Sequence, residues 1–249
     1  MNTTIEDMQR ESFNRICEEV YFNRWKRYKY YAKVKENITI EILNSCFKKS
    51  LNELVGLEIA CGIGHSADYL NSITKKTVGL DISDKSIELA RVIYPKTEFV
   101  LGSATNINYE NEHFDFVVIF VTFNHFNKNV AEKVIREANR ILKPGGVFVI
   151  CEPNIENIFI RILLKFLGVS NNCVKEGNNF YKLNELKSML LNKGFIINFS
   201  KRRSVIPYPF RFIYSPSLDF SLSKTFPMLC GYFAMGASKK AEDRPLKNI

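Results

Sequence analysis

The sequence of 249 residues lacks the features that mark membrane, secreted and zinc-binding proteins. No run approaches the roughly 18 uninterrupted apolar residues that a membrane-spanning helix needs. The N-terminal stretch MNTTIEDMQRESF has no basic segment followed by an apolar one, so no secretory signal is predicted. The six cysteines form no C-x-x-C pair and have no histidine near them at ligand spacing. We therefore expect no metal site, no disulfides and a cytoplasmic location.

Positive charge exceeds negative charge, with 35 lysines and arginines against 26 aspartates and glutamates and a net charge of +9. Such an excess is typical of proteins that bind nucleic acid or anionic lipid. It also arises when a composition rich in lysine, asparagine and isoleucine spreads lysine over the whole surface. Because the basic residues form only two local clusters, at 24–29 and 201–203, we favour the second interpretation and expect no nucleic-acid partner.

Apolar runs alternate with stretches of helical spacing through the centre of the chain, which predicts a parallel sheet covered on both faces. The last central helix, 131–142, is expected to stop at the K-P-G-G sequence of residues 143–146. Right-handed crossovers then give a doubly wound α/β sheet with a ligand crevice at the carboxyl ends of its strands. The expected strands of this core are Val55–Ala60, Thr77–Leu80, Phe99–Leu101, Phe116–Phe120 and Val147–Cys151.

The same pattern predicts one main domain with additions. Residues 1–50 are expected to form an N-terminal cap of two helical stretches, and residues 51–240 the domain itself. Insertions are expected at about 154–180 and 204–228, followed by a tail at 241–249.

The stretch GLEIACGIGHSA, residues 56–67, fits two kinds of cofactor site. Read from Gly62, it matches the G-x-G-x-x-G/A loop of a dinucleotide site. Read from Glu58, it is an apolar strand that ends on an acid, as in many S-adenosylmethionine (SAM) sites. A carboxylate repels a pyrophosphate, whereas SAM carries a cationic sulfonium and an α-ammonium. Glu58 therefore favours SAM, unless it is a strand-end acid that merely faces solvent.

Four blocks, in order along the chain, resemble the class I SAM-dependent methyltransferases that act on small molecules. They are VGLEIACGIG (55–64), VGLDIS (78–83), FVLGSATNINY with FDFVVIF (99–120) and RILKPGGVFVICEP (140–153). The resemblance implies a Rossmann-like sheet of seven mostly parallel strands. Its last two strands would be 195–200 and an antiparallel 232–237.

The resemblance also implies a SAM site at the strand ends. Glu58 and the loop glycines would surround the methionine part, and Asp81 would bind the ribose. Ile82 would pack on the adenine face, and the backbone at Ala104 would meet the adenine edge. The implied cofactor residues are Glu58, Ala60, Cys61, Gly62, Gly64, Asp81, Ile82, Ser103, Ala104 and Phe120.

Two positions depart from the family pattern. Ala60 stands where the first loop glycine is usual, which is a mild change if its φ is negative. Ser103 stands where an aspartate commonly accepts a hydrogen bond from the adenine amino group. A hydroxyl can accept that bond without the assistance of charge, so we expect slightly weaker cofactor binding.

Catalysis by this family needs a positioned acceptor, and a base only when the acceptor must lose a proton. His125, just after the fourth strand, is the candidate base; it could equally contact the substrate or serve only in packing. Tyr21 or Arg27, in the aromatic segment 19–31, would lie near the methionine carboxylate, unless that segment is an ordinary amphipathic helix. In this family the apolar insertions wall the acceptor pocket, which suits a small-molecule, lipid-linked, isoprenoid or peptide acceptor and permits contact with a membrane surface.

Three other functions stay open on the sequence. An RNA or DNA methyltransferase would suit the charge, but the D/N-P-P-Y/F motif of base methylation is absent and T-F-N-H stands there instead. The others are an NAD(P)-binding oxidoreductase and a SAM-binding module without catalysis. For the methyltransferase, the product would be S-adenosylhomocysteine (SAH). The sequence does not define the oligomeric state.

Overall fold

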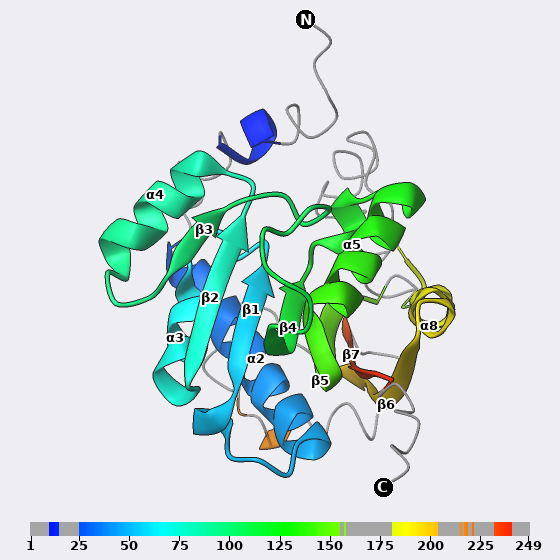
Figure 1. The fold of residues 1–249 in the computed structure, drawn as a ribbon. Coiled ribbons are helices and arrows are strands. Elements are labelled where there is room, and N and C mark those ends of the chain that lie inside the picture. The colour runs from blue at the N-terminus through cyan, green and yellow to red at the C-terminus, as the bar shows by residue number, and fades with distance from the viewer. Residues whose placement is uncertain are drawn as a thin grey trace, which may run out of the picture.

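A seven-stranded sheet forms the centre of the computed structural model, which describes residues 10–14, 25–154, 157, 181–203, 215, 217–218, 221 and 232–240. The strand order is β3-β2-β1-β4-β5-β7-β6 (Figure 1). All neighbouring pairs from β3 to β5 are parallel, and β7 runs antiparallel to both β5 and β6. The predicted doubly wound sheet and its antiparallel last strand are confirmed. The strands are β1 (Val55–Ile59), β2 (Lys76–Asp81), β3 (Phe99–Leu101), β4 (Phe114–Phe120), β5 (Leu142–Pro153), β6 (Phe195–Arg203) and β7 (Tyr232–Lys239).

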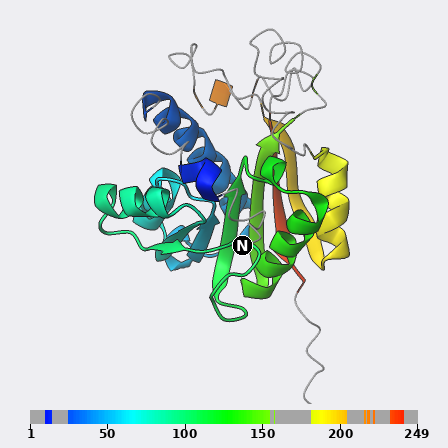
Figure 2. The ribbon, with the colours of Figure 1, turned by 90° about the horizontal axis from the view of Figure 1, so that it is seen from above.

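Helices cover both faces of the sheet, as the view from above shows (Figure 2). Two helices pack on one face, α5 (Lys128–Ile141) and α8 (Leu183–Asn192). The other face is covered by α2 (Trp25–Cys46), α3 (His65–Ile73) and α4 (Asp84–Ile93). Every residue of β4 is buried, because this central strand has helices on both sides.

Local sequence explains where the helices begin. Ser83 caps α4 by accepting a hydrogen bond from the Ser86 N–H at 3.1 Å, and Asn127 caps α5 through the Val130 N–H at 3.0 Å. These two caps fix the first residues of α4 and α5. On α5 the buried positions recur every three or four residues, which places one apolar face on the sheet. These positions are Ala131, Val134, Ile135, Ala138 and Ile141.

Among residues 1–50 the structure describes a short helical segment at 10–14 and the long helix α2. One detail of the sheet differs from expectation. The K-P-G-G sequence lies inside β5 instead of forming a separate turn, although α5 does end before it at Ile141. The register between β4 and β5 shifts at this point, and Gly145 has a φ of +76°. A bulge therefore accommodates Pro144, which cannot donate a ladder hydrogen bond.

The expected insertions at 154–180 and 204–228 and the tail at 241–249 lie mostly or wholly outside the described residues. Among the helices of the described part, none is both long and apolar enough to cross a membrane.

Candidate cofactor site

A cavity of about 350 Å³ lies at the carboxyl ends of β1, β2, β3 and β4. Its walls come from the ends of these strands and the loops after them, together with one residue each of α2, α4, α5 and the segment 10–14. Eight of the predicted site residues line it, namely Ala60, Gly62, Asp81, Ile82, Ser103, Ala104, Phe120 and His125. The position is that of a ligand crevice in a doubly wound fold.

The loop between β1 and α3 turns sharply through left-handed backbone conformations. Ala60, Gly62 and Gly64 have φ values of 57°, 56° and 83°. A side chain on Gly64 would place its Cβ 2.5 Å from the Phe99 ring, so this position requires glycine. The condition for a mild substitution at Ala60, a negative φ, is not met. Alanine there holds a strained conformation, because the chain must turn at once for the Cys61 N–H to reach the Leu80 carbonyl at 3.1 Å.

The Asp81 carboxylate joins the two loops that form the cavity floor. Oδ2 accepts a hydrogen bond from the Gly62 N–H at 2.8 Å, and Oδ1 accepts one from the Ser83 N–H at 2.9 Å. Burial raises the pKa of Asp81, and these backbone donors oppose that shift. Each carboxylate oxygen can accept a second bond, so Asp81 fixes the loop and still presents acceptor capacity to the cavity.

Glu58 lies on β1, is not among the residues that line the cavity and is 3% exposed. Its neighbours Leu57 and Ile59 pack toward α5 and α8, so Glu58 points to the opposite face, and its Oε2 has no hydrogen-bond partner. The solvent-facing alternative for this residue is thus excluded. Burial raises the pKa of Glu58 to about 8; Lys35 lowers it, while Glu36 and Asp81 raise it further. A cation entering the cavity would favour the ionised carboxylate.

Lys35 is a cavity residue that the sequence interpretation missed. Its ammonium lies 5.4 Å from the centroid of the Phe120 ring. The available signal was weak: Lys35 precedes Ile38 and Thr39, both buried, by three and four residues on α2. Of the two residues proposed for the methionine carboxylate, Tyr21 lies outside the described residues. Arg27 lies in the first turn of α2, and its side chain is not described.

The other predicted residues divide between the cavity and the core. The Ser103 hydroxyl accepts from the Thr105 N–H at 3.2 Å and lies 2.9 Å from the Thr105 hydroxyl, so it stabilises the turn after β3. Cys61 packs in a core cluster with Phe99 between α3 and α4, and burial raises the pKa of its thiol. Neither Cys61 nor Gly64 lines the cavity; both shape the loop that does.

His125 ends a short 3-10 helix, η2 (Phe123–His125), that follows β4. The buried Glu152 carboxylate holds this helix by accepting from the Thr122 N–H at 2.8 Å and the Phe123 N–H at 3.1 Å. Burial raises the pKa of Glu152 to about 7, and these two donors oppose the shift. The arrangement places His125 among the residues that line the cavity, together with Asp81 and the glycine loop.

The segment 10–14 bridges the cavity from the end of β2 to the end of β4. The Asn14 side chain donates to Asp84 Oδ1 at 2.6 Å and accepts from the Ser83 hydroxyl at 2.7 Å. Phe13 lines the cavity and meets the His125 ring edge-on, with centroids 5.2 Å apart. Figure 1 shows this segment above the carboxyl ends of the strands. Within the described residues, no three His, Cys, Asp or Glu side chains gather as metal ligands.

Comparison with known proteins shows a methyltransferase domain within this chain. The model of the methyltransferase domain matches residues 57–150. A relative from Mycolicibacterium smegmatis, named "Probable S-adenosylmethionine-dependent methyltransferase", is 30% identical over 98 residues, covering 39% of this chain and 37% of that protein. A demethylmenaquinone methyltransferase from Leptospira interrogans is 30% identical over 168 residues, covering 63% and 65%. The chain thus spans less than two thirds of either relative.

Solved structures share the fold across most of the chain. A Thermotoga maritima protein described as a SAM-dependent methyltransferase, possible histamine N-methyltransferase, has a TM-score of 0.65 and 20% sequence identity. The match covers 93% of this chain and 99% of that chain. Fold, domain model and relatives agree that residues 57–150 form a methyltransferase domain of the class I, SAM-dependent kind.

Proposed function

We propose that this chain binds SAM in the cavity and transfers its methyl group in line to an O, N or C atom of an acceptor. The observation that carries the proposal is the buried Glu58 carboxyl, whose Oε2 has no hydrogen-bond partner and which interacts electrostatically with two cavity residues, Lys35 and Asp81. An α-amino acid brings one cation and one anion to a site. Glu58 suits the ammonium of the methionine part, and Lys35 suits its carboxylate. A pyrophosphate would gain nothing from Glu58.

The remaining contacts follow from the lining residues. Asp81 would accept from the ribose hydroxyls, and the segment Gly102–Thr105 with Ile82 would hold the adenine ring. Bound SAM supplies an electrophilic methyl group. The chain contributes orientation and the exclusion of water. His125 would take a proton from an acceptor that must lose one, and its ring meets Phe13 edge-on.

An apolar acceptor suits the part of the cavity next to His125. Five apolar side chains line this side, namely Phe13, Phe120, Val121, Phe126 and Val130. The demethylmenaquinone methyltransferase among the relatives supports an acceptor with a large apolar part. We therefore propose a small apolar molecule, or the reactive end of a lipid-like one, and no nucleic acid.

Isothermal titration calorimetry tests the cofactor. SAM and SAH are expected to bind, whereas NAD(H) is not. At pH 7 the Glu58 carboxyl is mostly protonated in the empty site, because its pKa is about 8. Binding of the SAM ammonium should therefore release up to one proton, measured as a dependence of the heat on the ionisation enthalpy of the buffer. Glu58→Gln should abolish that release.

Two results would contradict the proposal. Binding of NAD(H) without SAM would assign the cavity to a dinucleotide. Binding of SAM without SAH production, across apolar acceptors offered in detergent, would leave a SAM-binding module. Lys35→Gln should weaken SAH but leave 5′-methylthioadenosine unaffected, because that ligand lacks the amino-acid part. Lys33→Gln is the matched control, since Lys33 lies on the same helix and pairs with Glu36 at 3.4 Å.

A further inference from the structure

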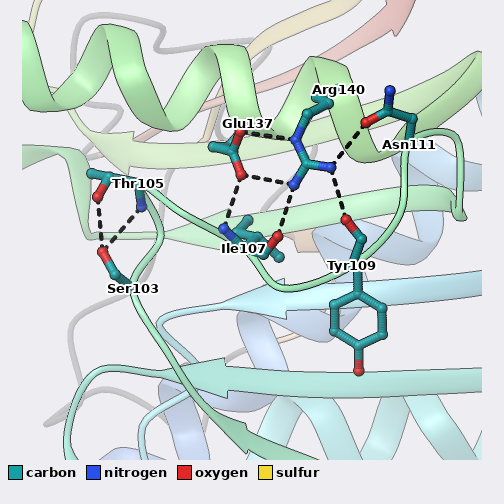
Figure 3. Close-up of polar contacts among 7 residues, drawn as sticks. All are labelled: Ser103, Thr105, Ile107, Tyr109, Asn111, Glu137 and Arg140. Carbon is teal, nitrogen blue, oxygen red and sulfur yellow. Dashed lines mark hydrogen bonds and ion pairs between the residues drawn. The ribbon is translucent and has the colours of Figure 1, made fainter.

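The segment after β3 that forms the adenine side of the cavity has little regular structure of its own. Several hydrogen bonds nonetheless fix it to the body of the protein. A single arginine of α5, Arg140, holds the segment at Ile107, Tyr109 and Asn111 (Figure 3). The Tyr109 hydroxyl donates to Glu98 at 3.0 Å, which ties the same segment to the loop before β3.

Every N–H of the Arg140 guanidinium has a partner. Nε donates to Oε1 of Glu137 and Nη2 donates to Oε2, each at 2.9 Å. The other Nη2 bond reaches the Ile107 carbonyl at 2.7 Å. The Nη1 bonds reach the Tyr109 carbonyl at 2.7 Å and the Asn111 side chain at 3.0 Å. Five donors in a fixed plane thus meet five acceptors, which a lysine could not reproduce.

Glu137 also holds this segment, and we call the pair Arg140 and Glu137 the clamp. Its Oε2 accepts a hydrogen bond from the Ile107 N–H at 2.9 Å, so α5 holds both backbone polar groups of Ile107. The Arg140 guanidinium lowers the pKa of Glu137, which keeps this carboxylate ionised at neutral pH. Ile107 is also buried, and a backbone bridge between Ser103 and Asn106 closes the turn that precedes it.

We infer that Arg140 and Glu137 are positioning residues for the adenosine end of the cofactor, acting through the segment 103–111. The inference rests on the proposed function. Neither side chain lines the cavity, whereas Ser103, Ala104 and Thr105 do. If the clamp opens, a smaller fraction of molecules holds these residues in the binding geometry. The apparent dissociation constant then rises by the reciprocal of that fraction.

Binding of two ligands separates this effect from a general loss of structure. SAH reports on the whole site, and 5′-methylthioadenosine reports on the adenosine end alone. Arg140→Lys is expected to weaken both by the same factor, roughly tenfold if a tenth of the molecules keep the binding geometry. Glu137→Gln keeps an oxygen for the Ile107 N–H and should lose less. Arg136→Lys is the control, because Arg136 lies exposed one turn earlier on the same helix.

Hydrogen exchange supplies a readout that does not depend on ligand. In Arg140→Lys the amides of 103–111 should exchange faster, while those of α5 between 131 and 138 keep their wild-type rates. Equal binding of both ligands by Arg140→Lys and wild type would overturn the inference, and so would a loss confined to SAH. If the wild type binds neither ligand, the proposed function fails instead.

Discussion

Ala60, in the loop after β1, has a strained backbone conformation. Its φ of 57° costs an L-residue roughly 1–2 kcal/mol relative to ordinary regions. We expect Ala60→Gly to raise the free energy of unfolding by about 0.5–1 kcal/mol, since glycine adopts this conformation freely but loses more chain entropy on folding. Urea denaturation measures the difference. Ala104→Gly, at an alanine of the same cavity without a positive φ, should instead destabilise; a loss of stability in Ala60→Gly would show that its methyl group is needed.

Glu58 makes stability depend on pH in a predictable direction. Its pKa rises from a usual value of 4.5 to about 8 on folding, because burial disfavours the charged form. Between these values the folded state keeps a proton that the unfolded chain has lost, so the free energy of unfolding falls as pH rises, and it levels off above about pH 8. Glu152, with a pKa of about 7, contributes in the same direction.

The variant Glu58→Gln should remove the Glu58 part of this slope. We expect it to be more stable than wild type above pH 8, by at least about 1 kcal/mol, and to gain little at pH 5. Denaturation curves at pH 5, 7 and 9 give the comparison. If the free energy of unfolding changes with pH in the same way for both proteins, Glu58 has an ordinary pKa in the folded state.

The limits of prediction from sequence are clear at the level of these side chains. The position of Asp81 and Gly62 at the cavity could be predicted, because the carboxyl ends of parallel strands form the ligand crevice of a doubly wound sheet. Lys35 was not predicted, because helical spacing alone does not show whether Lys33 or Lys35 faces the cavity. Arg140 carried no signal, since an arginine late in an amphipathic helix is usually solvated. The φ of Ala60 depends on how the loop meets β2, which local sequence does not encode.

Among the elements, α2 and the segment 10–14 have different tasks in the site. The buried residues Val34, Ile38 and Ile42 of α2 pack on the sheet, and Ile42 approaches Gly236 so closely that a Cβ there would lie 2.5 Å from it. Removing residues 1–35 would therefore test folding and cofactor binding together. A side chain in the segment 10–14 gives a cleaner test.

Asn14→Ala removes the two hydrogen bonds that tie the segment 10–14 to Ser83 and Asp84. If SAM binds beneath this segment, its affinity should fall roughly fivefold, the value of about one net hydrogen bond. The melting temperature should hardly change, because the segment covers the cavity and not the core. Glu11→Ala, at an exposed position of the same segment, is the control. Faster SAM dissociation in Asn14→Ala alone would support closure by the segment, and identical rates in all three proteins would contradict it.

The strands could be predicted from sequence more fully than the cap. A strand with one exposed face alternates apolar and polar residues, so a continuous apolar run such as 116–120 indicates a sheet that is covered on both faces. The alternation of these runs with helices along the chain predicts the doubly wound topology. The bulge at Pro144 escaped prediction because it arises from pairing with β4, which lies far away in the sequence.

The molecule as a whole carries a net charge of +9, and the side chains of its basic cluster at 24–29 are not described. Within the described ranges, basic side chains pair with carboxylates on many different elements. These pairs are Lys33–Glu36, Lys76–Glu98, Arg140–Glu137, Lys143–Asp115, Lys193–Glu132, Lys201–Glu41 and Lys239–Glu112. Among the side chains that the structure describes, these pairs neutralise basic groups on separate elements and give no sign of a continuous track for a phosphate backbone.

We therefore expect little binding to RNA or duplex DNA at 0.15 M salt. Fluorescence anisotropy with labelled oligonucleotides over a salt series measures it. A protein that neutralises several phosphates loses affinity steeply with salt, with a logarithmic slope of about −0.9 per phosphate on duplex DNA. A slope of that kind would reopen the nucleic-acid alternative.

The place of β7 has a consequence for synthesis of the chain. β7 lies between β5 and β6, although both neighbours come before it in sequence. Until residues 232–239 have left the ribosome, β5 keeps an unpaired edge and β6 has no partner in the sheet. Exposed apolar edges of this kind pair readily with other chains. The nascent protein thus passes through a stage in which aggregation competes with folding, and a translational pause just before residue 232 should prolong its need for chaperones.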